Sequence, residues 1–247
     1  MAQRHGGMKK EENMKYDVIV VGTGGTGTFF INAFSRVLAQ KRGCCYNLYL
    51  VDGDTVEKKN LSRQTFQEED VGRSKSIVMA EALNEVFGLN WKAVDQYVLN
   101  ADQIHDLANS GYTPLVVGCV DNHACRLVLE EVFSKRKDMI YLDSANEYSS
   151  GEVVFAAKEG GKVLGPPRSH YFADILEGDK RAVTEMSCEE LNNAEPQHIA
   201  TNMLAANILL TEACRVLEGE KRYGFVSFDT DSFSSEFYPY TPQGVKA

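Results

Sequence analysis

Polar side chains that could hold a phosphate group are concentrated between residues 52 and 75. This stretch contains Asp52, Asn60, Arg63, Gln64 and Lys75, and the residues between them show no apolar periodicity. Cations and amides neutralise and orient phosphate oxygens, whereas a nicotinamide ring offers them little negative charge. The stretch therefore favours a bound polyanion, most simply a triphosphate.

A glycine-rich run stands just before it. The β-branched segment 17–21 predicts a buried strand, and the run 22–27 (Gly-Thr-Gly-Gly-Thr-Gly) leads into an expected helix over 25–40. Glycines expose main-chain N–H groups to an approaching phosphate. We therefore expect phosphate or adenosine to contact Gly22, Gly24, Gly25 and Gly27. Asp52 ends a second expected strand, over 46–51, where an acidic residue meets ribose hydroxyls.

The elements that must position these residues alternate along the chain. We expect strands over 91–98, 114–119, 139–143, 151–157, 223–228 and 234–238, and helices over 76–87, capped by Ser74, 102–109, 123–133 and from Pro196 onward. The last two strands should be antiparallel. This order predicts an α/β fold: a Rossmann-like, mostly parallel sheet flanked by helices, with antiparallel strands at the C-terminal side.

The domain organisation follows from composition along the chain. Residues 1–15 are polar and predict a mobile arm, and residues 16–247 form one expected domain. Residues 158–195 contain several glycines and prolines and little periodicity. We expect this segment to be a long excursion without packed elements.

Charge and cysteine content narrow the functional classes. The 247 residues carry a net charge of −9 without a long basic patch, so nucleic acid is not an expected partner. No signal peptide or membrane-spanning segment is apparent, and we expect a cytoplasmic protein. The six cysteines form no C-x-x-C pair, so we expect reduced thiols and no structural zinc.

Three motifs together carry a resemblance to a known family. They are G-x-G-G-x-G, then D-x-D-x-V-x-x-x-N-L-x-R-Q beginning at Asp52, then G-x-x-K ending at Lys75. The combination closely resembles the adenylation domain of ubiquitin-activating-like (E1-like) enzymes, the ThiF and MoeB group. The overall layout further resembles the ThiF-type proteins of bacterial plasmid and phage cassettes known as PRTRC systems.

The resemblance implies an activity and its cofactors. It implies ATP- and Mg2+-dependent adenylation of the C-terminal carboxylate of a small ubiquitin-like or sulfur-carrier protein, by an enzyme that forms a homodimer. Asn60, Arg63, Gln64 and Lys75 would contact the phosphates. Asp121, in an Asp-Asn pair, would bind Mg2+, although the family often has another aspartate where this chain has Gly118. One or two carboxylates facing a triphosphate suffice for Mg2+.

Several interpretations stay open. Cys188, in the segment that would cross over the active site, is either a nucleophile that accepts the activated acyl group or an inert loop thiol. Asp54 and Glu57 are either loop caps or ligand contacts. The glycine run and Asp52 alone would also fit an NAD(P)-dependent oxidoreductase, which leaves Arg63 and Asp121 without a role. A non-catalytic scaffold that binds a ubiquitin-like protein is the second alternative.

Overall fold

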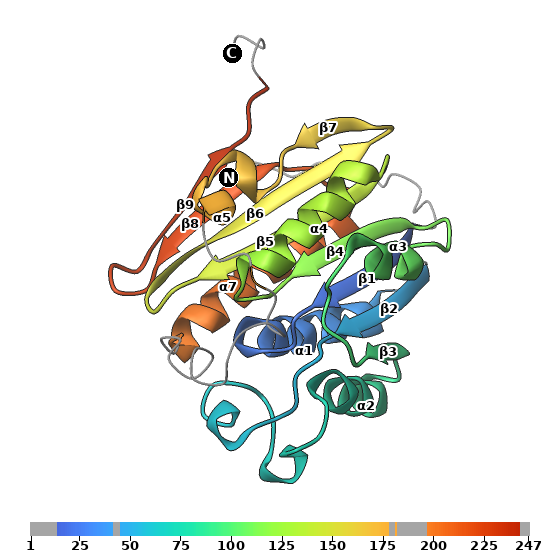
Figure 1. Ribbon diagram of the computed structural model, residues 1–247, viewed down its shortest axis with the longest axis vertical. Coiled ribbons are helices and arrows are strands. Elements are labelled where there is room, and N and C mark those ends of the chain that lie inside the picture. The colour runs from blue at the N-terminus through green and yellow to red at the C-terminus, as the bar shows by residue number, and fades with distance from the viewer. Residues whose placement is uncertain (1–13, 42–44, 178–180, 182–196, 243–247) are drawn as a thin grey trace, which may run out of the picture.

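The described residues form a central sheet of nine strands. The structure is a computed structural model, and it describes residues 14–41, 45–177, 181 and 197–242. The strand order is β3-β2-β1-β4-β5-β6-β8-β9, with β7 paired to β6 (Figure 1). The strands are β1 (Lys15–Val21), β2 (Cys45–Val51), β3 (Trp91–Val94), β4 (Thr113–Gly118), β5 (Met139–Asn146), β6 (Ser150–Glu159), β7 (Lys162–Gly165), β8 (Gly224–Asp229) and β9 (Ser234–Pro239).

The sheet has a parallel part and an antiparallel part. Strands β1 to β5 pair in parallel, whereas β6, β7, β8 and β9 add antiparallel strands beside β5. The apolar residues of β1 alternate between two cores, since Val18 and Val20 face one side of the sheet and Ile19 and Val21 the other. This arrangement confirms the fold class predicted from the sequence.

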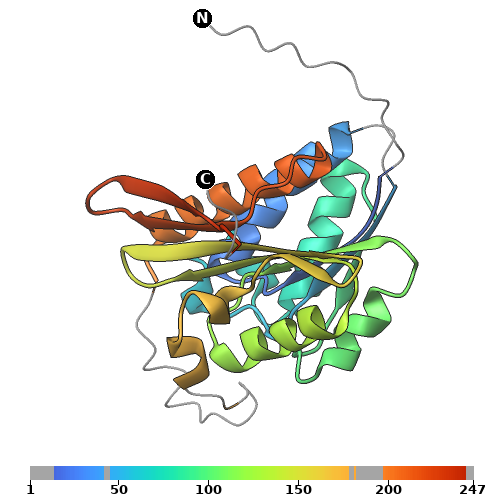
Figure 2. The ribbon, with the colours of Figure 1, turned by 90° about the horizontal axis from the view of Figure 1, so that it is seen from above.

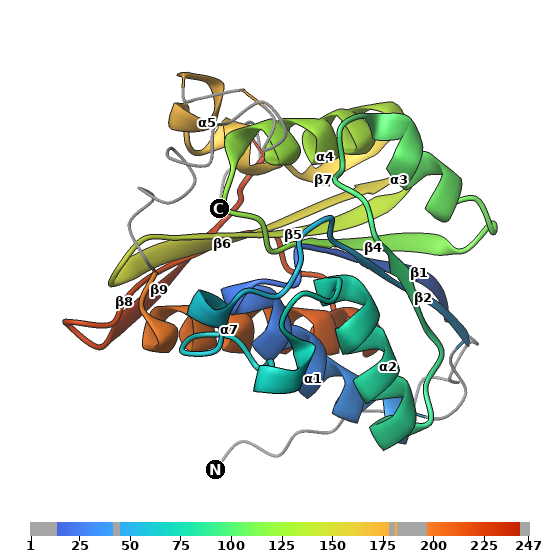
Figure 3. The same cartoon turned by 60° about the horizontal axis from the view of Figure 1, so that its bottom comes forward.

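Helices cover both faces of the sheet. One face carries α1 (Gly25–Gln40), α2 (Lys75–Phe87) and α7 (Ile199–Leu217), and the other carries α3 (Ala101–Leu107) and α4 (His123–Lys135) (Figures 2 and 3). The short elements are α5 (Asp174–Glu177) and three single turns, η1 (Lys58–Asn60), η2 (Glu68–Asp70) and η3 (Arg168–His170). Among the described helices, none has the length and apolar content to cross a membrane.

The strand order reverses between β1 and β4. The chain passes from β1 to β2 in one direction and reaches β4 on the other side of β1. Ligands of open α/β sheets bind in the crevice that such a reversal leaves at the carboxyl ends of the strands. The glycine run follows β1 and Asp121 follows β4, so the fold brings both to this crevice.

Several boundaries differ from the sequence-based prediction. Strand β3 ends at Val94, four residues earlier than expected, and α7 begins at Ile199, where the His198 side chain caps the first turn. Ser74 occupies the cap position of α2, but its hydroxyl donates to Asp95 instead of capping the helix. Pro196, the predicted start of the long helix, lies outside the described residues.

The beginning of the expected excursion is also more regular than predicted. It contains the end of β6, all of β7, η3 and α5. Gly160 and Gly161 both have positive φ, 58° and 82°, and form the tight turn that folds β7 back onto β6. Such a glycine pair is a hairpin signal. The prediction that this part of the segment lacks packed elements was therefore wrong.

Candidate functional site

A cleft of about 1110 Å3 opens at the carboxyl ends of the parallel strands. It brings together residues from the glycine run, from the loop between β2 and α2, and from the segment after β4. Among the residues predicted from the sequence, the cleft is lined by Gly22, Gly24, Gly25, Asp52, Asn60, Arg63, Gln64, Lys75 and Asp121. Segments that are distant in the sequence therefore share one space.

The glycine run makes the close approaches on which the cleft depends. Gly22 has φ of 92°, and a Cβ there would lie 2.6 Å from the carbonyl oxygen of Cys119, at the end of β4. Gly27 is not among the lining residues. A Cβ on Gly27 would lie 2.1 Å from the Gly22 carbonyl oxygen. The predicted phosphate-contact residue Gly27 therefore packs α1 against the turn, while Gly24 and Gly25 face the cleft.

Asp52 is tied to the glycine run by hydrogen bonds. Its Oδ2 accepts from the Thr23 main-chain N–H at 2.6 Å and from Thr23 Oγ1 at 2.8 Å, and its Oδ1 accepts from the Asp54 N–H at 2.8 Å. Burial raises the pKa of the Asp52 carboxyl, more strongly than the nearby Lys75 charge lowers it. A carboxylate accepts about four hydrogen bonds, so Oδ1 retains capacity for a ribose hydroxyl.

Lys75 is a buried cation held by Asp54. Only 5% of Lys75 is exposed, and its Nζ donates to Asp54 Oδ2 at 2.8 Å. Tyr97 donates to the other oxygen of Asp54 at 2.6 Å. Burial raises the pKa of Asp54, but the charge and hydrogen bond of Lys75, with the Tyr97 hydrogen bond, outweigh it and leave that pKa below its usual value. Asp54 therefore orients Lys75, and because it also lines the cleft, a contact with a ligand stays a prediction.

The loop after β2 presents Arg63 and Gln64 to the cleft. Asn60 is buried and stabilises this loop, because its Oδ1 accepts from the Glu57 N–H and its carbonyl accepts from the N–H groups of Arg63 and Gln64. The Arg63 side chain makes no hydrogen bond or ion pair with the described residues. Gln64 is also buried, and its Oε1 has no partner within the same part of the chain. The Arg63 guanidinium is thus available to an anionic ligand, whereas the unpaired Gln64 Oε1 is an acceptor and would need a donor from the ligand.

Asp121 offers an exposed carboxylate at the end of β4. Its neighbour Asn122 caps α4 by accepting from the Cys125 N–H at 2.8 Å. The carboxylate of Asp121 forms no hydrogen bond or ion pair with residues that the structure describes. A single free carboxylate in the same cleft as Arg63 and Lys75 fits a Mg2+ ion that also binds phosphate oxygens and water.

A second aspartate at this edge serves a structural role. Asp143 on β5 lies beside Gly118 but is completely buried, and its carboxylate pairs with Arg168 and with Arg126. Arg126 also donates to the carbonyl oxygens of Val120 and Ser144, which joins the ends of β4 and β5. Arg126 therefore supports the sheet edge, and Arg73, paired with Glu81, lies on the surface.

Sequence reasoning missed four polar residues that line or support the cleft: Thr23, Tyr97, Asn146 and Asn202. Thr23 lies inside the glycine run, and the motif itself assigns a role only to the glycines. Tyr97 follows a strand that ends earlier than expected. The two asparagines belong to β5 and α7, and no local pattern connects them with the glycine run.

Three of the six cysteines bear on the site. Cys188, either an acyl acceptor or an inert loop thiol by sequence, lies outside the described residues. Cys119 and Cys125 lie beside the cleft, but burial raises the pKa of both thiols, that of Cys125 to about 12. A thiol with so high a pKa is a poor nucleophile near neutral pH.

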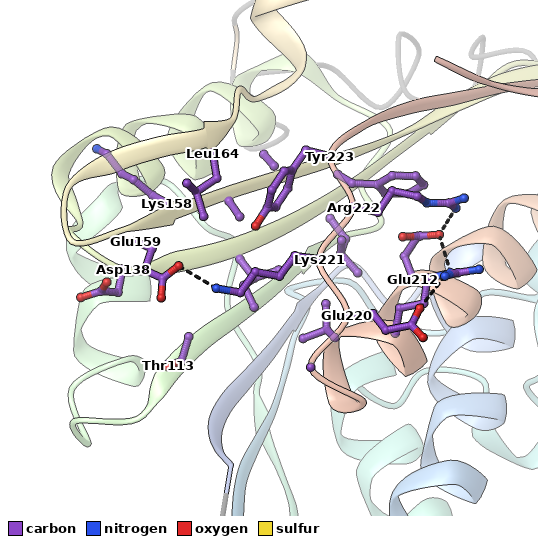
Figure 4. A pocket seen from close by; sticks show the side chains of 18 of the residues that line it. Thr113, Asp138, Lys158, Glu159, Leu164, Glu212, Glu220, Lys221, Arg222 and Tyr223 are labelled. Atoms are coloured by element: carbon purple, nitrogen blue, oxygen red, sulfur yellow. Dashed lines mark hydrogen bonds and ion pairs between the residues drawn. The ribbon is translucent and has the colours of Figure 1, made fainter. Parts of the chain in front are cut away.

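A second cavity, of about 260 Å3, lies at the opposite edge of the sheet (Figure 4). It is bordered by the starts of β1, β4 and β5 and by the end of α7. Several charged side chains around it pair with one another: Lys221 with Glu159, and Arg222 and Arg215 with Glu212. It shares none of the polar residues predicted for phosphate contact.

The sequence of the chain is similar to those of known proteins. A family model described as the ThiF family matches residues 3–242. Ubiquitin-like modifier-activating enzyme 5 of Culex quinquefasciatus is 31% identical over 138 residues, which are 51% of this chain and 33% of that protein. The enzyme of the same name from Dictyostelium discoideum is 30% identical over 131 residues, 49% of this chain and again 33% of that protein. The chain thus spans about a third of the length of these relatives.

Solved structures share the fold. Microcin C7 biosynthetic enzyme MccB in complex with N-formylated MccA superposes with a TM-score of 0.67 and 18% identity, covering 92% of this chain and 64% of that chain. A structure of E. coli MccB with ATP gives a TM-score of 0.65 and 15% identity, over 90% of this chain and 63% of that chain. At these identities the likeness establishes the fold.

Proposed function

The chain belongs to the ThiF family, and from this premise we propose that it binds ATP in the cleft and adenylates a carboxylate on a small partner protein. The observation that carries the proposal is the convergence of the glycine run, Arg63, Lys75 and Asp121 on one cleft. The two curated relatives are named as activating enzymes for ubiquitin-like modifiers, and one structure of similar fold is described as MccB with ATP. These descriptions support nucleotide binding by this chain.

The roles of the residues follow from their contacts. Asp52 would accept a hydrogen bond from the ribose, because its Oδ1 has capacity left. Gly22, Gly24 and Gly25 would offer main-chain donors to phosphate oxygens. Arg63 and Lys75 would neutralise the charge that spreads over those oxygens, and Asn60 would fix the loop from which Arg63 extends. The Gln64 side-chain amide N–H would donate to a phosphate oxygen.

The reaction is an attack of a carboxylate oxygen on the α-phosphorus of ATP. A bond forms between that oxygen and phosphorus, the bond to the β-bridging oxygen breaks, and pyrophosphate leaves with its electron pair. The chain contributes mainly position and charge, because no proton transfer is needed between a carboxylate and ATP. Mg2+, held by Asp121 and the phosphates, would supply further neutralisation of the leaving group.

The acceptor we propose is the C-terminal carboxylate of a small ubiquitin-like or sulfur-carrier protein, and we propose that the enzyme acts as a homodimer. Transfer to Cys188 would follow adenylation. With Cys188→Ala we expect normal AMP adduct formation and loss of the later covalent conjugate, measured by intact mass. Normal conjugate formation by this variant would leave Cys188 as a loop thiol.

The test of adenylation is a comparison of variants with matched controls. We expect Arg63→Ala and Asp121→Ala each to abolish AMP adduct formation on a Gly-Gly-ended partner protein, and to weaken ATP binding with Mg2+ by about tenfold or more. Arg73→Ala, an exposed arginine in the same loop, and Asp106→Ala, an exposed aspartate on α3, should behave as the unaltered protein.

Three results would contradict the proposal. Unaltered adduct formation by both active-site variants would remove Arg63 and Asp121 from the mechanism. Binding of a nicotinamide cofactor in preference to ATP, measured by isothermal titration calorimetry, would favour the oxidoreductase alternative. ATP binding without adduct formation on any partner would favour the scaffold.

A further inference from the structure

The small cavity of Figure 4 lies between the sheet and the end of α7, and it shares no lining residue with the cleft. Its lining is largely apolar, because Leu142 of β5, Phe155 of β6 and Val216 of α7 belong to one core. Ala157 also lines it, two residues after Phe155 on the same face of β6. Since alanine carries a single methyl group there, the space between β6 and the end of α7 stays unfilled.

The charged residues around the cavity favour a neutral ligand. Lys221 pairs with Glu159 at 2.7 Å, and Arg215 pairs with Glu220 at 2.6 Å. Cations and anions are equal in number among the lining residues, so their charges compensate one another. They are Lys158, Arg215, Lys221, Arg222, Asp138, Glu159, Glu212 and Glu220.

One polar group of the lining is unpaired and accessible. The Tyr223 hydroxyl makes no hydrogen bond with the residues that the structure describes, and Tyr223 is only half-buried. Figure 4 shows its ring extending into the space between Leu164 and Lys221. The ring is held in place, because Tyr223 packs on Gly165, where a Cβ would lie 2.5 Å from the Tyr223 Cβ. A phenol hydroxyl in this position can both donate and accept a hydrogen bond.

We propose that this cavity binds a small neutral molecule with an apolar body and one hydroxyl group. The apolar body packs on Leu142, Phe155 and Val216, and the hydroxyl bonds to Tyr223 Oη. The volume of about 260 Å3 is sufficient, because an apolar cavity of about 150 Å3 already holds a benzene molecule. Removal of apolar surface from water drives the binding, and the hydrogen bond selects for the hydroxyl.

Binding of para-cresol and of toluene tests the two parts of this proposal. The probes have the same methyl-substituted ring and differ by one hydroxyl group. In Tyr223→Phe we expect para-cresol to bind about three- to tenfold more weakly, which corresponds to one neutral hydrogen bond, and toluene to bind within about twofold of its original affinity. Isothermal titration calorimetry with the full-length protein measures both affinities.

Substitution of Ala157 tests the location of the site. The larger side chain of Ala157→Leu fills the space, so both probes should bind at least about tenfold more weakly. Ala157→Val adds less volume and should weaken both probes by a smaller factor, which keeps the test decisive if the leucine variant does not fold. The matched controls are Ala93→Leu, an exposed position on β3, and Tyr49→Phe on β2. Both lie outside the cavity and should change neither affinity.

The possible failures have different meanings. The inference is wrong if the unaltered protein binds neither probe, or if the folded Ala157 variants keep the original affinities, since the probes then bind elsewhere. An equal effect of Tyr223→Phe on the two probes, or no effect on either, overturns the hydroxyl contact and with it the ligand class. ATP binding, measured on the same preparation, reports separately on the proposed function, because the cavity and the cleft have no residue in common.

Discussion

At the scale of single residues, the site depends on how its charges are held before a ligand arrives. Lys75 is almost completely buried, and a buried ammonium group is costly unless it is paired. Asp54 provides the pair, and its side chain is 43% exposed, so solvent screens part of the attraction. A triphosphate in the cleft would share the Lys75 charge with Asp54 and gain from its fixed position.

Removal of Asp54 tests this arrangement. We expect Asp54→Ala to reduce the free energy of unfolding of the ligand-free protein by about 1–2 kcal/mol, less than for a fully buried pair because of the exposure. ATP should then raise the melting temperature of the variant more than that of the unaltered protein, since phosphate oxygens replace the lost partner of Lys75. Differential scanning fluorimetry measures both.

The matched control is Glu68→Ala, which removes an exposed ion pair with Lys58 and should change the free energy of unfolding by less than about 0.5 kcal/mol. The pH dependence gives a second readout. Because the pKa of Asp54 is lowered in the folded protein, its stabilisation is complete above the ordinary value of 3.8 and is lost as the pH falls through the folded value. The difference between variant and unaltered protein should be constant from about pH 7 to pH 5 and shrink below about pH 4.

At the scale of elements, the turn from β1 to α1 determines whether the cleft can form. The turn brings main-chain atoms of β1, α1 and the end of β4 into contact, at distances that leave no room for a side chain at Gly22 or Gly27. The four side chains that border the turn, Thr23, Gln64, Asn146 and Asn202, come from four different elements or loops. The geometry of the turn is therefore needed both for folding and for binding.

Alanine substitutions at two glycines of this turn should change the free energy of unfolding by very different amounts. At Gly27 the new Cβ would lie 2.1 Å from the Gly22 carbonyl oxygen, so we expect Gly27→Ala to cost about 3 kcal/mol or more of unfolding free energy. At Gly24 the nearest atom would be 3.8 Å away, and φ is −84°. Gly24→Ala should stay within about 1 kcal/mol of the unaltered protein. Urea denaturation followed by circular dichroism would contradict this reasoning if the two variants were equally stable.

At the scale of the whole molecule, one continuous sheet connects the parallel and antiparallel parts. Helix α7, from the C-terminal part of the chain, packs against α1 as well as β5 and β6 (Figure 3). The hydrogen bonds of the buried Asn202 side chain with Thr26 and Asn146 lie at this junction. Helix α7 therefore connects α1 with the part of the sheet where the antiparallel strands begin.

This connection predicts cooperative unfolding. The single tryptophan, Trp91, is buried on β3 at one end of the sheet and donates to Ser35 of α1 at 2.9 Å. We expect urea transitions measured by Trp91 fluorescence and by far-ultraviolet circular dichroism to coincide, as in a single domain. Separate midpoints would mean that the antiparallel part unfolds independently. This result would contradict the prediction of a single domain over residues 16–247.

The sequence by itself determined most of the element order and which loops meet at the cleft. The helix expected over 25–40 coincides with α1, because a glycine turn and an apolar stripe are local signals. The residues after β1, β2 and β4 were expected at one sheet edge, because parallel strands place their carboxyl ends together. Strand ends were less accurate, and β3 stops at Val94 because pairing with β2 stops there.

Only the tertiary structure decided which partners these residues have. Asp54 pairs with Lys75 and Tyr97, at separations of 21 and 43 residues, and Thr26 bonds to Asn202 at a separation of 176. Such contacts depend on how α2 and α7 pack against the sheet. A local pattern encodes which face of a helix is buried, but not which donor on that face finds an acceptor, since that depends on side chains contributed by distant segments.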